Sequence, residues 1–251
     1  MSPKKNLKRL LLNILGLVLL LFAWQVVATL QSNPAIPSVV AIAKALGKII
    51  VDPKLYISLL STVKLVVVGV LLATVVGIVV AFLMSLNDNI KNIIIPIVEC
   101  LRNIPAITLF PMLLVIFGIG DSSRIFVIFW TAYPSIVIQT FYGLNNIERS
   151  IIEAAQNCGA SKLQTYRYIR FPLAVFDILN GVRIAIGAGF IAIVVAEMLG
   201  ATKGLGYMIL WCTNSFKYPE TYAYIVLVAA IGGLFNYLTL KIIKKFERKT
   251  L

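Results

Sequence analysis

The chain contains no histidine among its 251 residues, which removes the commonest general base and a common metal ligand. It has only three cysteines, Cys100, Cys158 and Cys212, which fall in different parts of the expected topology, so neither a disulfide framework nor a metal site is expected. The phosphate-binding pattern Gly-x-x-x-x-Gly-Lys-Ser/Thr is also missing. We therefore expect no catalytic residue, no metal and no nucleotide site in this chain.

Charged residues are scarce, at 13% of the chain, whereas 60% of the residues are hydrophobic and the mean hydropathy is +0.94. Soluble domains are about half apolar and a quarter charged, so this composition indicates an integral membrane protein. The formal net charge of +13 could suggest nucleic acid as a partner. The basic residues, however, gather beside apolar runs, as residues at a membrane surface do. We expect contact with lipid and not with nucleic acid.

The apolar runs predict an all-α, polytopic fold in one membrane domain, 1–251, with six spans at about 10–30, 59–84, 93–117, 125–143, 173–199 and 222–243. A cleaved signal peptide is the alternative for the first run. That run has about twenty residues and no small-x-small cleavage site, which favours a retained anchor. Between the first two spans, 37–51 is amphipathic, with Ser38 as its expected N-cap, and suits a helix in the membrane interface.

Lysine and arginine are unevenly distributed between the two sides of this topology. One side, which includes both termini and the segment 147–171, holds 14 of them, and the other side holds 6. By the positive-inside rule, loops rich in lysine and arginine stay in the cytoplasm. We therefore expect both termini and 147–171 to face the cytoplasm.

The segment 147–171, called the polar insert below, separates the fourth and fifth spans and carries both signs of charge. Ser150 with Glu153, and Ser161 with Gln164, match capping boxes, which predict two helix starts. Gly159 between them suits the left-handed end of the first helix. We expect two short helices at an angle, the second ending before Pro172 restarts the chain as a span. From the residues alone, an ordinary helical loop remains an equal alternative.

Within this segment, Glu153-Ala154-Ala155 is followed at fixed intervals by Gly159, Ile169 and Pro172. This pattern resembles the "EAA" signature of the membrane subunits of ATP-binding-cassette importers. The resemblance extends over most of the chain. Within the family, the chain resembles the nitrate/sulfonate/taurine branch in seven short segments: Pro37-Ser38, Arg102-Asn-Ile-Pro105, Phe117-Gly-Ile-Gly120, Gly159-Ala-Ser161, Gly181-Val-Arg183, Ala196-Glu-Met-Leu-Gly200 and Gly204-Leu-Gly206.

The resemblance implies the permease fold of a type I importer, in which the insert docks on an ATPase subunit. Its coupling residues would be Glu153, Ala154, Ala155, Gly159, Ala160, Ser161, Ile169 and Pro172. The implied partners are two cytoplasmic ATP-binding subunits, which carry the ATP and Mg²⁺, a second copy of this chain and an extracytoplasmic solute-binding protein. The implied location is the bacterial inner membrane. The implied solute is a small anion such as a sulfonate, taurine, nitrate or bicarbonate. The alternatives are a vitamin precursor or other heterocycle, or a self-contained secondary transporter.

Four charged residues within the spans are candidates for the solute route. Glu99 and Arg102 lie three residues apart in the proline-rich third span, where they either line the route or form a structural ion pair. Arg183 and Glu197 lie in the fifth span, and Arg183 suits attraction of an anion. The Gly200–Gly206 segment is expected to be a turn, followed by an aromatic interfacial belt.

Overall fold

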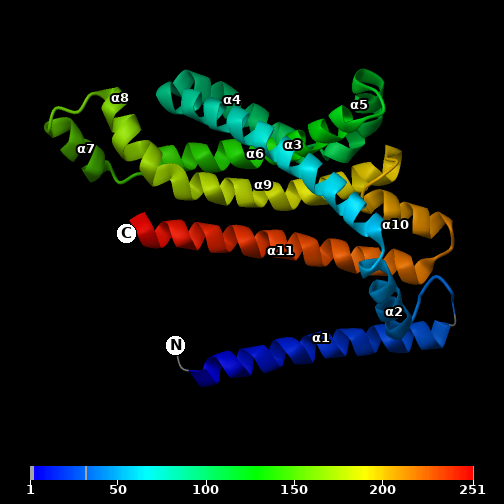
Figure 1. The fold of residues 1–251 in the computed structure, drawn as a ribbon. Coiled ribbons are helices and arrows are strands. Elements are labelled where there is room, and N and C mark those ends of the chain that lie inside the picture. The colour runs from blue at the N-terminus through cyan, green and yellow to red at the C-terminus, as the bar shows by residue number, and fades with distance from the viewer. Residues whose placement is uncertain (1–2, 32, 251) are drawn as a thin grey trace.

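A computed structural model describes residues 3–31 and 33–250, with side chains for 11–31 and 33–245, and this part of the chain is helical with no strand. Figure 1 shows the helices as a layered bundle with one long helix set apart. The elements are α1 (Pro3–Gln31), α2 (Val39–Ile50), α3 (Pro53–Leu86), α4 (Asp88–Asn103), η1 (Ala106–Leu109), α5 (Phe110–Phe117), α6 (Asp121–Asn145), α7 (Arg149–Asn157), α8 (Lys162–Thr165), η2 (Tyr166–Arg170), α9 (Phe171–Gly200), α10 (Leu205–Asn214) and α11 (Tyr218–Thr250).

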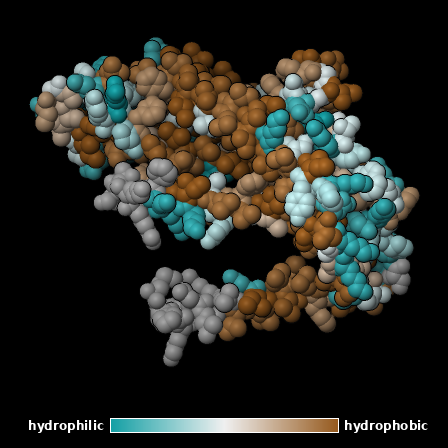
Figure 2. All heavy atoms as spheres, in the orientation of Figure 1, coloured by the Kyte–Doolittle hydropathy of each residue, from teal (hydrophilic) through white to brown (hydrophobic). Residues whose placement is uncertain are grey.

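Three long helices, α3, α6 and α9, form the centre of the molecule, and α6 has its largest contacts with α9 and α3. Their shared core includes Val66 of α3, Ile128 and Ile136 of α6 and Phe190 of α9, all almost fully buried. The outward faces of α3 and α9 carry exposed apolar side chains, such as Leu71 and Val75 of α3 and Ile191 of α9, and Figure 2 shows much of the visible face of the bundle in brown. Such surface is stable only against lipid or another protein, so the fold is that of a membrane protein.

About six spans were expected, and the described part of the chain contains five to six candidate spans, judged by length and composition. Five helical stretches are long and apolar enough to cross a membrane: Leu11–Gln31, Pro53–Leu86, Asp121–Asn145, Lys162–Gly200 and Tyr218–Lys245. The sixth consists of Asp88–Asn103 and Ala106–Phe117, which meet at an angle of 82°.

The third span, expected at about 93–117 and rich in proline, is therefore bent and consists of two helical parts. Helix α4 ends where Ile104 takes an extended conformation, with φ −85° and ψ 114°, before Pro105. Proline disfavours the helical conformation of the residue before it and lacks an N–H of its own, so the turn breaks there. Pro96 stays within α4, and Pro111 lies in the first turn of α5, where a missing N–H removes no helical bond.

The two ends of the bundle are different in content. Figure 1 shows that α1 begins and α11 ends at the same end of the bundle as α7 and α8. Helices α2, α5 and α10 lie at the opposite end. These are called the α7–α8 end and the α2–α10 end below. An even number of crossings places both termini on one side, as the topology predicted.

Two short elements flank the spans at the α2–α10 end. Helix α2 has the expected cap, because the Ser38 hydroxyl oxygen accepts a hydrogen bond from the Ala41 N–H at 3.2 Å. Helix α10 was not expected, since part of its sequence was interpreted as a turn with an aromatic belt. Its buried residues, Leu205, Met208, Ile209 and Cys212, recur at helical spacing, and this periodicity is the signal that could have identified it.

Candidate functional site

The polar insert lies at the α7–α8 end and forms two short helices, α7 and α8, as the sequence predicted. None of the residues of α7 is buried. Among the expected coupling residues, Glu153, Ala154, Gly159 and Ser161 are exposed, and Ala155 and Ala160 are half-buried. The structure thus brings these six residues together at an accessible tip.

Gly159 ends α7 in the left-handed conformation that its sequence position predicted, with φ +82°. The Ala160 N–H bonds to the Ala155 carbonyl at 3.0 Å, and the Gly159 N–H bonds to the Gln156 carbonyl at 2.9 Å. This pair of bonds is the Schellman arrangement, which satisfies the last carbonyls of a helix and needs a residue that tolerates positive φ. Gly159 therefore sets the angle between α7 and α8.

Only one of the two expected capping boxes is present. The Ser161 hydroxyl accepts from the Gln164 N–H at 3.3 Å, and the Ser161 N–H donates to the Gln164 side chain at 2.8 Å, as predicted. The box at Ser150 is wrong, because α7 begins one residue earlier with Glu148 at its N-cap and no side-chain cap. Glu153 instead accepts a hydrogen bond from Arg149 Nε at 2.7 Å along the same helix.

The expected break before Pro172 is also wrong. Helix α8 continues through the π turn η2 directly into α9, so that Lys162–Gly200 is one helical stretch. The Phe171 N–H bonds to the Tyr166 carbonyl five residues back, which is the π pattern, and Pro172 follows in the first turn of α9. A proline in that turn removes no essential bond. Ile169 lies half-buried in η2, and the polar insert is joined to α9 by the continuous helical stretch that begins at Lys162.

Three of the four route candidates lie on accessible surface of the bundle. Glu99 and Arg102 are both exposed on α4, and Arg183 is half-buried on α9. Among the side chains that the structure describes, no ion pair joins Glu99 to Arg102, so the structural pair considered from the sequence is not formed. These three residues remain available to line a route against a second protein surface.

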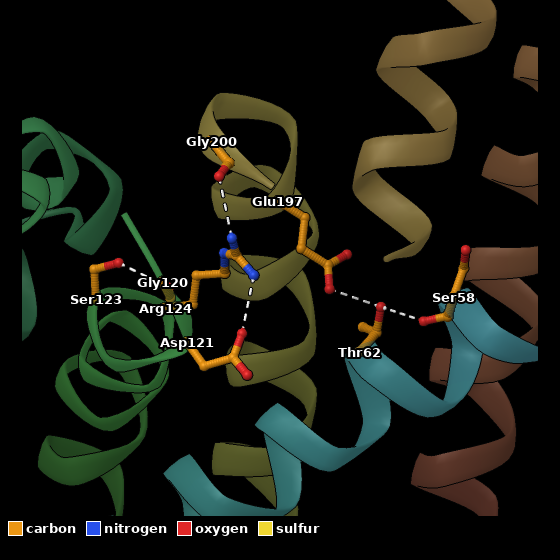
Figure 3. A network of polar contacts seen from close by, with 8 residues as sticks. All are labelled: Ser58, Thr62, Gly120, Asp121, Ser123, Arg124, Glu197 and Gly200. Carbon is orange, nitrogen blue, oxygen red and sulfur yellow. Dashed lines mark hydrogen bonds and ion pairs between the residues drawn. The ribbon is translucent and has the colours of Figure 1, made fainter. Parts of the chain in front are cut away.

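Glu197 has a different environment, shown in Figure 3. It is 1% exposed, so it does not line an open route in this protomer. Its carboxylate accepts hydrogen bonds from the Thr62 hydroxyl at 2.8 Å and from the Gly206 N–H at 2.9 Å. The Leu205 N–H in turn donates to the Thr62 oxygen at 3.0 Å. Because a buried carboxylate needs donors, this set of bonds fastens α3, α9 and the start of α10 together.

The loop that packs against Glu197 has no room for a residue larger than glycine at position 204. Gly204 has φ +123°, and a Cβ added there would lie 2.3 Å from the Glu197 carboxyl carbon. The Gly204-Leu-Gly206 sequence, which had been interpreted only as a flexible turn, therefore wraps closely around one buried carboxylate. The loop between α9 and α10 is held in place and is not a free turn.

Arg124 completes the set, although no sequence pattern marks it out. It is 5% exposed and donates Nη2 to the Gly200 carbonyl at 3.1 Å and Nη1 to Asp121 at 3.2 Å. Gly200 is the last residue of α9, where a helix carries partial negative charge that a cation stabilises. Arg124 thus ties the start of α6 to the end of α9. We call Thr62, Asp121, Arg124, Glu197 and Gly206 the α2–α10 clasp.

Comparison with known proteins decides the family. Residues 73–251, well over half of the chain, match the family described as "Binding-protein-dependent transport system inner membrane component". The chain belongs to this family. It is thus a multi-pass membrane subunit of the ATP-binding-cassette importer class, as the EAA pattern predicted.

Several relatives of this family member have named solutes. The taurine transport system permease protein TauC of Escherichia coli is 29% identical over 236 residues, covering 90% of this chain and 85% of the relative. The nitrate import permease protein NrtB of Synechococcus elongatus is 32% identical over 218 residues, with 83% and 77% covered. The putative aliphatic sulfonates transport permease protein SsuC of Bacillus subtilis is 27% identical over 230 residues, with 91% and 82% covered. These relatives confirm the resemblance to the nitrate/sulfonate/taurine branch.

Solved structures confirm the fold. Two inward-facing crystal forms of the MetNI methionine ABC transporter match with TM-scores of 0.65 and 0.68. They share 23% and 21% sequence identity, cover 74% and 78% of this chain, and are themselves covered to 92% and 98%. This chain therefore has the fold of a type I importer permease, with additional length of its own.

Proposed function

We propose that this chain forms half of the translocation route of an importer for a small anion, with ATP hydrolysed by two separate subunits bound at the α7–α8 end. The family membership and the taurine, sulfonate and nitrate named for its relatives support this proposal. The chain itself carries no nucleotide-binding pattern, so the energy is expected to come from a partner.

The surface of the polar insert is the single observation that carries the proposal. Ile151 is 42% exposed and Leu163 is 72% exposed, beside the small side chains of Ala154 and Ala155. Ile151 lies on α7, which is outside the candidate spans, and Leu163 lies at the α7–α8 end of the long stretch Lys162–Gly200, next to the charged Lys162. An apolar patch with a polar rim is typical of a protein docking site. The fixed angle at Gly159 and the continuous path into α9 suit the transfer of movement from such a partner.

The α7–α8 end is proposed to face the cytoplasm of a bacterial cell, with both termini on that side of the inner membrane. The excess of lysine and arginine at this end supports that orientation. The α2–α10 end then faces outward, where a solute-binding protein would deliver its ligand.

A second copy of the chain is proposed to complete the route. Glu99, Arg102 and Arg183 are accessible from outside the three-helix core, so a route lined by them requires another surface to enclose it. A two-fold pair of identical subunits is the simplest closed assembly. Charges at membrane depth rarely face lipid, so Arg183 is proposed to face the route. Its positive charge would attract an anion there.

The direct test is co-purification. The chain carrying an affinity tag, expressed with a candidate ATPase and solute-binding protein of the same organism, should retain the ATPase after solubilisation in detergent. Replacing Leu163, which is exposed at the tip, with Asp should release it. Retention of ATPase by Leu163→Asp, or none with the unaltered chain, would contradict the proposal. Melting of the binding protein with taurine, alkylsulfonates, nitrate or bicarbonate would identify the anion.

A further inference from the structure

We infer that Tyr166 and Arg170 are positioning residues that fasten the polar insert to α3 and α6, so that movement at α7 and α8 turns the three central helices together. The inference rests on the proposed function, because it assumes that a partner moves the insert. Neither residue belongs to the EAA pattern, and both lie in the π turn η2.

Arg170 holds the end of α6. Its Nη1 donates to the Leu144 carbonyl at 3.1 Å and to the Asn145 side-chain oxygen at 3.3 Å. Leu144 and Asn145 are the last two residues of α6, whose final carbonyls have no partner within the helix. A guanidinium is well suited to this position, since it supplies several donors and complements the negative end of the helix.

Tyr166 holds the end of α3 in the same way. Its hydroxyl donates to the carbonyl of Ser85, one residue before the end of α3. Its ring packs edge-on against Phe82 of α3, with 5.5 Å between the ring centroids. The Arg170 guanidinium carbon lies 4.8 Å from the centre of the Tyr166 ring, so the two contacts support each other. We call Tyr166, Arg170 and their partners on α3 and α6 the α7–α8 clasp.

The arrangement is selective within a five-residue turn. The sequence Tyr166-Arg-Tyr-Ile-Arg170 contains two tyrosines and two arginines. Tyr166 and Arg170 are half-buried against the bundle, whereas Arg167 and Tyr168 are exposed, with Tyr168 68% exposed. The inward pair contacts two other helices, whereas the contact found for the outward pair is between its own members, with 5.7 Å from the Arg167 guanidinium carbon to the centre of the Tyr168 ring. The outward pair is therefore a matched control.

The two clasps bind the same three helices at opposite ends. The α2–α10 clasp joins Thr62 of α3, Arg124 of α6 and Glu197 of α9. The α7–α8 clasp joins Ser85 of α3, Leu144 of α6 and Arg170 of η2, which continues directly into α9. With packed side chains between them, α3, α6 and α9 cannot slide past one another without breaking these buried and partly buried bonds. Movement that enters at the polar insert is thus delivered to the α2–α10 end.

The experiment follows movement between the two ends in the reconstituted complex with its ATPase. Spin labels are placed on Lys203→Cys, an exposed position in the loop held by the α2–α10 clasp, after replacement of Cys100, Cys158 and Cys212. The label separation in the paired subunits is measured by pulsed electron resonance without nucleotide and with ATP and vanadate. ATP turnover and the melting temperature are recorded on the same samples.

In the chain that carries only the label and the cysteine replacements, we expect the separation between the two labels to differ between the nucleotide-free state and the state with ATP and vanadate. Arg170→Gln and Tyr166→Phe should shift the equilibrium between the two separations by roughly 2- to 30-fold. ATP turnover and melting temperature should stay near their unaltered values. Arg170→Lys, which keeps the charge and a donor, should recover part of the change. Arg167→Gln and Tyr168→Phe should leave the change in separation as it is in the unaltered chain.

Different results separate the two proposals. A full response in Arg170→Gln, or an equal loss in Arg167→Gln, overturns the inference and leaves the proposed function standing. A loss accompanied by lower melting temperature and lower ATP turnover shows a folding role only and also overturns it. The absence of any nucleotide-driven change in the unaltered complex counts against the proposed function itself.

Discussion

At the scale of single residues, surroundings decide what a charge within the membrane does. Glu197 and Glu99 are both acidic residues in helices of the bundle. Glu197 is 1% exposed and accepts bonds from two other segments, whereas Glu99 is exposed on α4. The first holds the fold together, and the second is free to meet solute or a partner. Composition alone gave the same interpretation to both.

This difference in burial predicts that replacing Glu197 destabilises the protein strongly, whereas replacing Glu99 has little effect on its stability. Glu197→Ala leaves the Thr62 hydroxyl and the Gly206 N–H buried without their acceptor, so it should lower the free energy of unfolding by about 3–5 kcal/mol. Glu99→Ala, at an exposed position, should change it by about 0.5 kcal/mol or less. Thermal unfolding of the detergent-solubilised chain measures both. Equal melting temperatures for the two variants would contradict the α2–α10 clasp.

Gly159 provides a prediction on activity. Its φ of +82° is strained for residues with a Cβ and most of all for β-branched ones. Gly159→Val should reach the membrane in normal amounts but hydrolyse ATP without uptake, because the angle between α7 and α8 changes. Gly159→Asn, which tolerates this conformation, should keep most of the uptake. Normal uptake by Gly159→Val in proteoliposomes would show that the angle has no role in coupling.

At the scale of elements, the long spans were readable from the sequence because apolar length is a strong signal. The smaller features depended on geometry that local patterns do not contain. Ser150 matched a capping box, yet α7 begins one residue before it. Pro172 was interpreted as a break, yet the π turn before it lets the helix continue. In contrast, the Ile104-Pro105 break falls in the span whose prolines were noted from the sequence, and the α10 periodicity is also present in the sequence.

The candidate site was predictable to a similar degree. The coupling residues carry a spaced pattern, so they were found together. The residues of the two clasps, such as Thr62, Arg124, Tyr166 and Arg170, carry none. Most of their partners lie 25 to 143 residues distant in the sequence, and only the fold brings these together.

The exposure of α7 predicts how its cysteine reacts. Cys158, at the end of α7, is exposed, whereas Cys212 in α10 is buried. Burial raises the pKa of the Cys212 thiol, and the nearby Glu220 carboxylate raises it further. Since the thiolate is the reactive form, Cys212 should stay unlabelled by maleimide at pH 8, where an ordinary thiol reacts readily.

In a Cys100→Ser background, an impermeant maleimide should therefore label only Cys158. Labelling should occur in inverted membrane vesicles and not in intact spheroplasts, and bound ATPase should protect the thiol. Labelling of Cys158 from the outside of intact cells would contradict the proposed orientation. Labelling that bound ATPase does not affect would place the docking site elsewhere.

At the scale of the whole molecule, a clasped three-helix core is surrounded by helices held more loosely. Helix α1 meets the rest mainly near its end, where Trp24 Nε1 donates to the Pro37 carbonyl at 3.1 Å and the Trp24 ring lies 5.3 Å from that of Tyr222. Most of its apolar side chains are exposed. Lipid or a second copy is expected to cover them. The core transmits movement, and the periphery adapts to its surroundings.

The central claim is that the polar insert connects this chain to an ATP-hydrolysing partner that drives transport. The most direct test is uptake of radiolabelled taurine and nitrate by proteoliposomes containing the chain, its ATPase and the binding protein. We expect uptake of at least one of these anions, or of the anion that stabilises the binding protein, only when ATP is supplied on the ATPase side. We expect none with the chain alone. Uptake by the chain alone, or uptake that continues without ATP, would contradict the central claim.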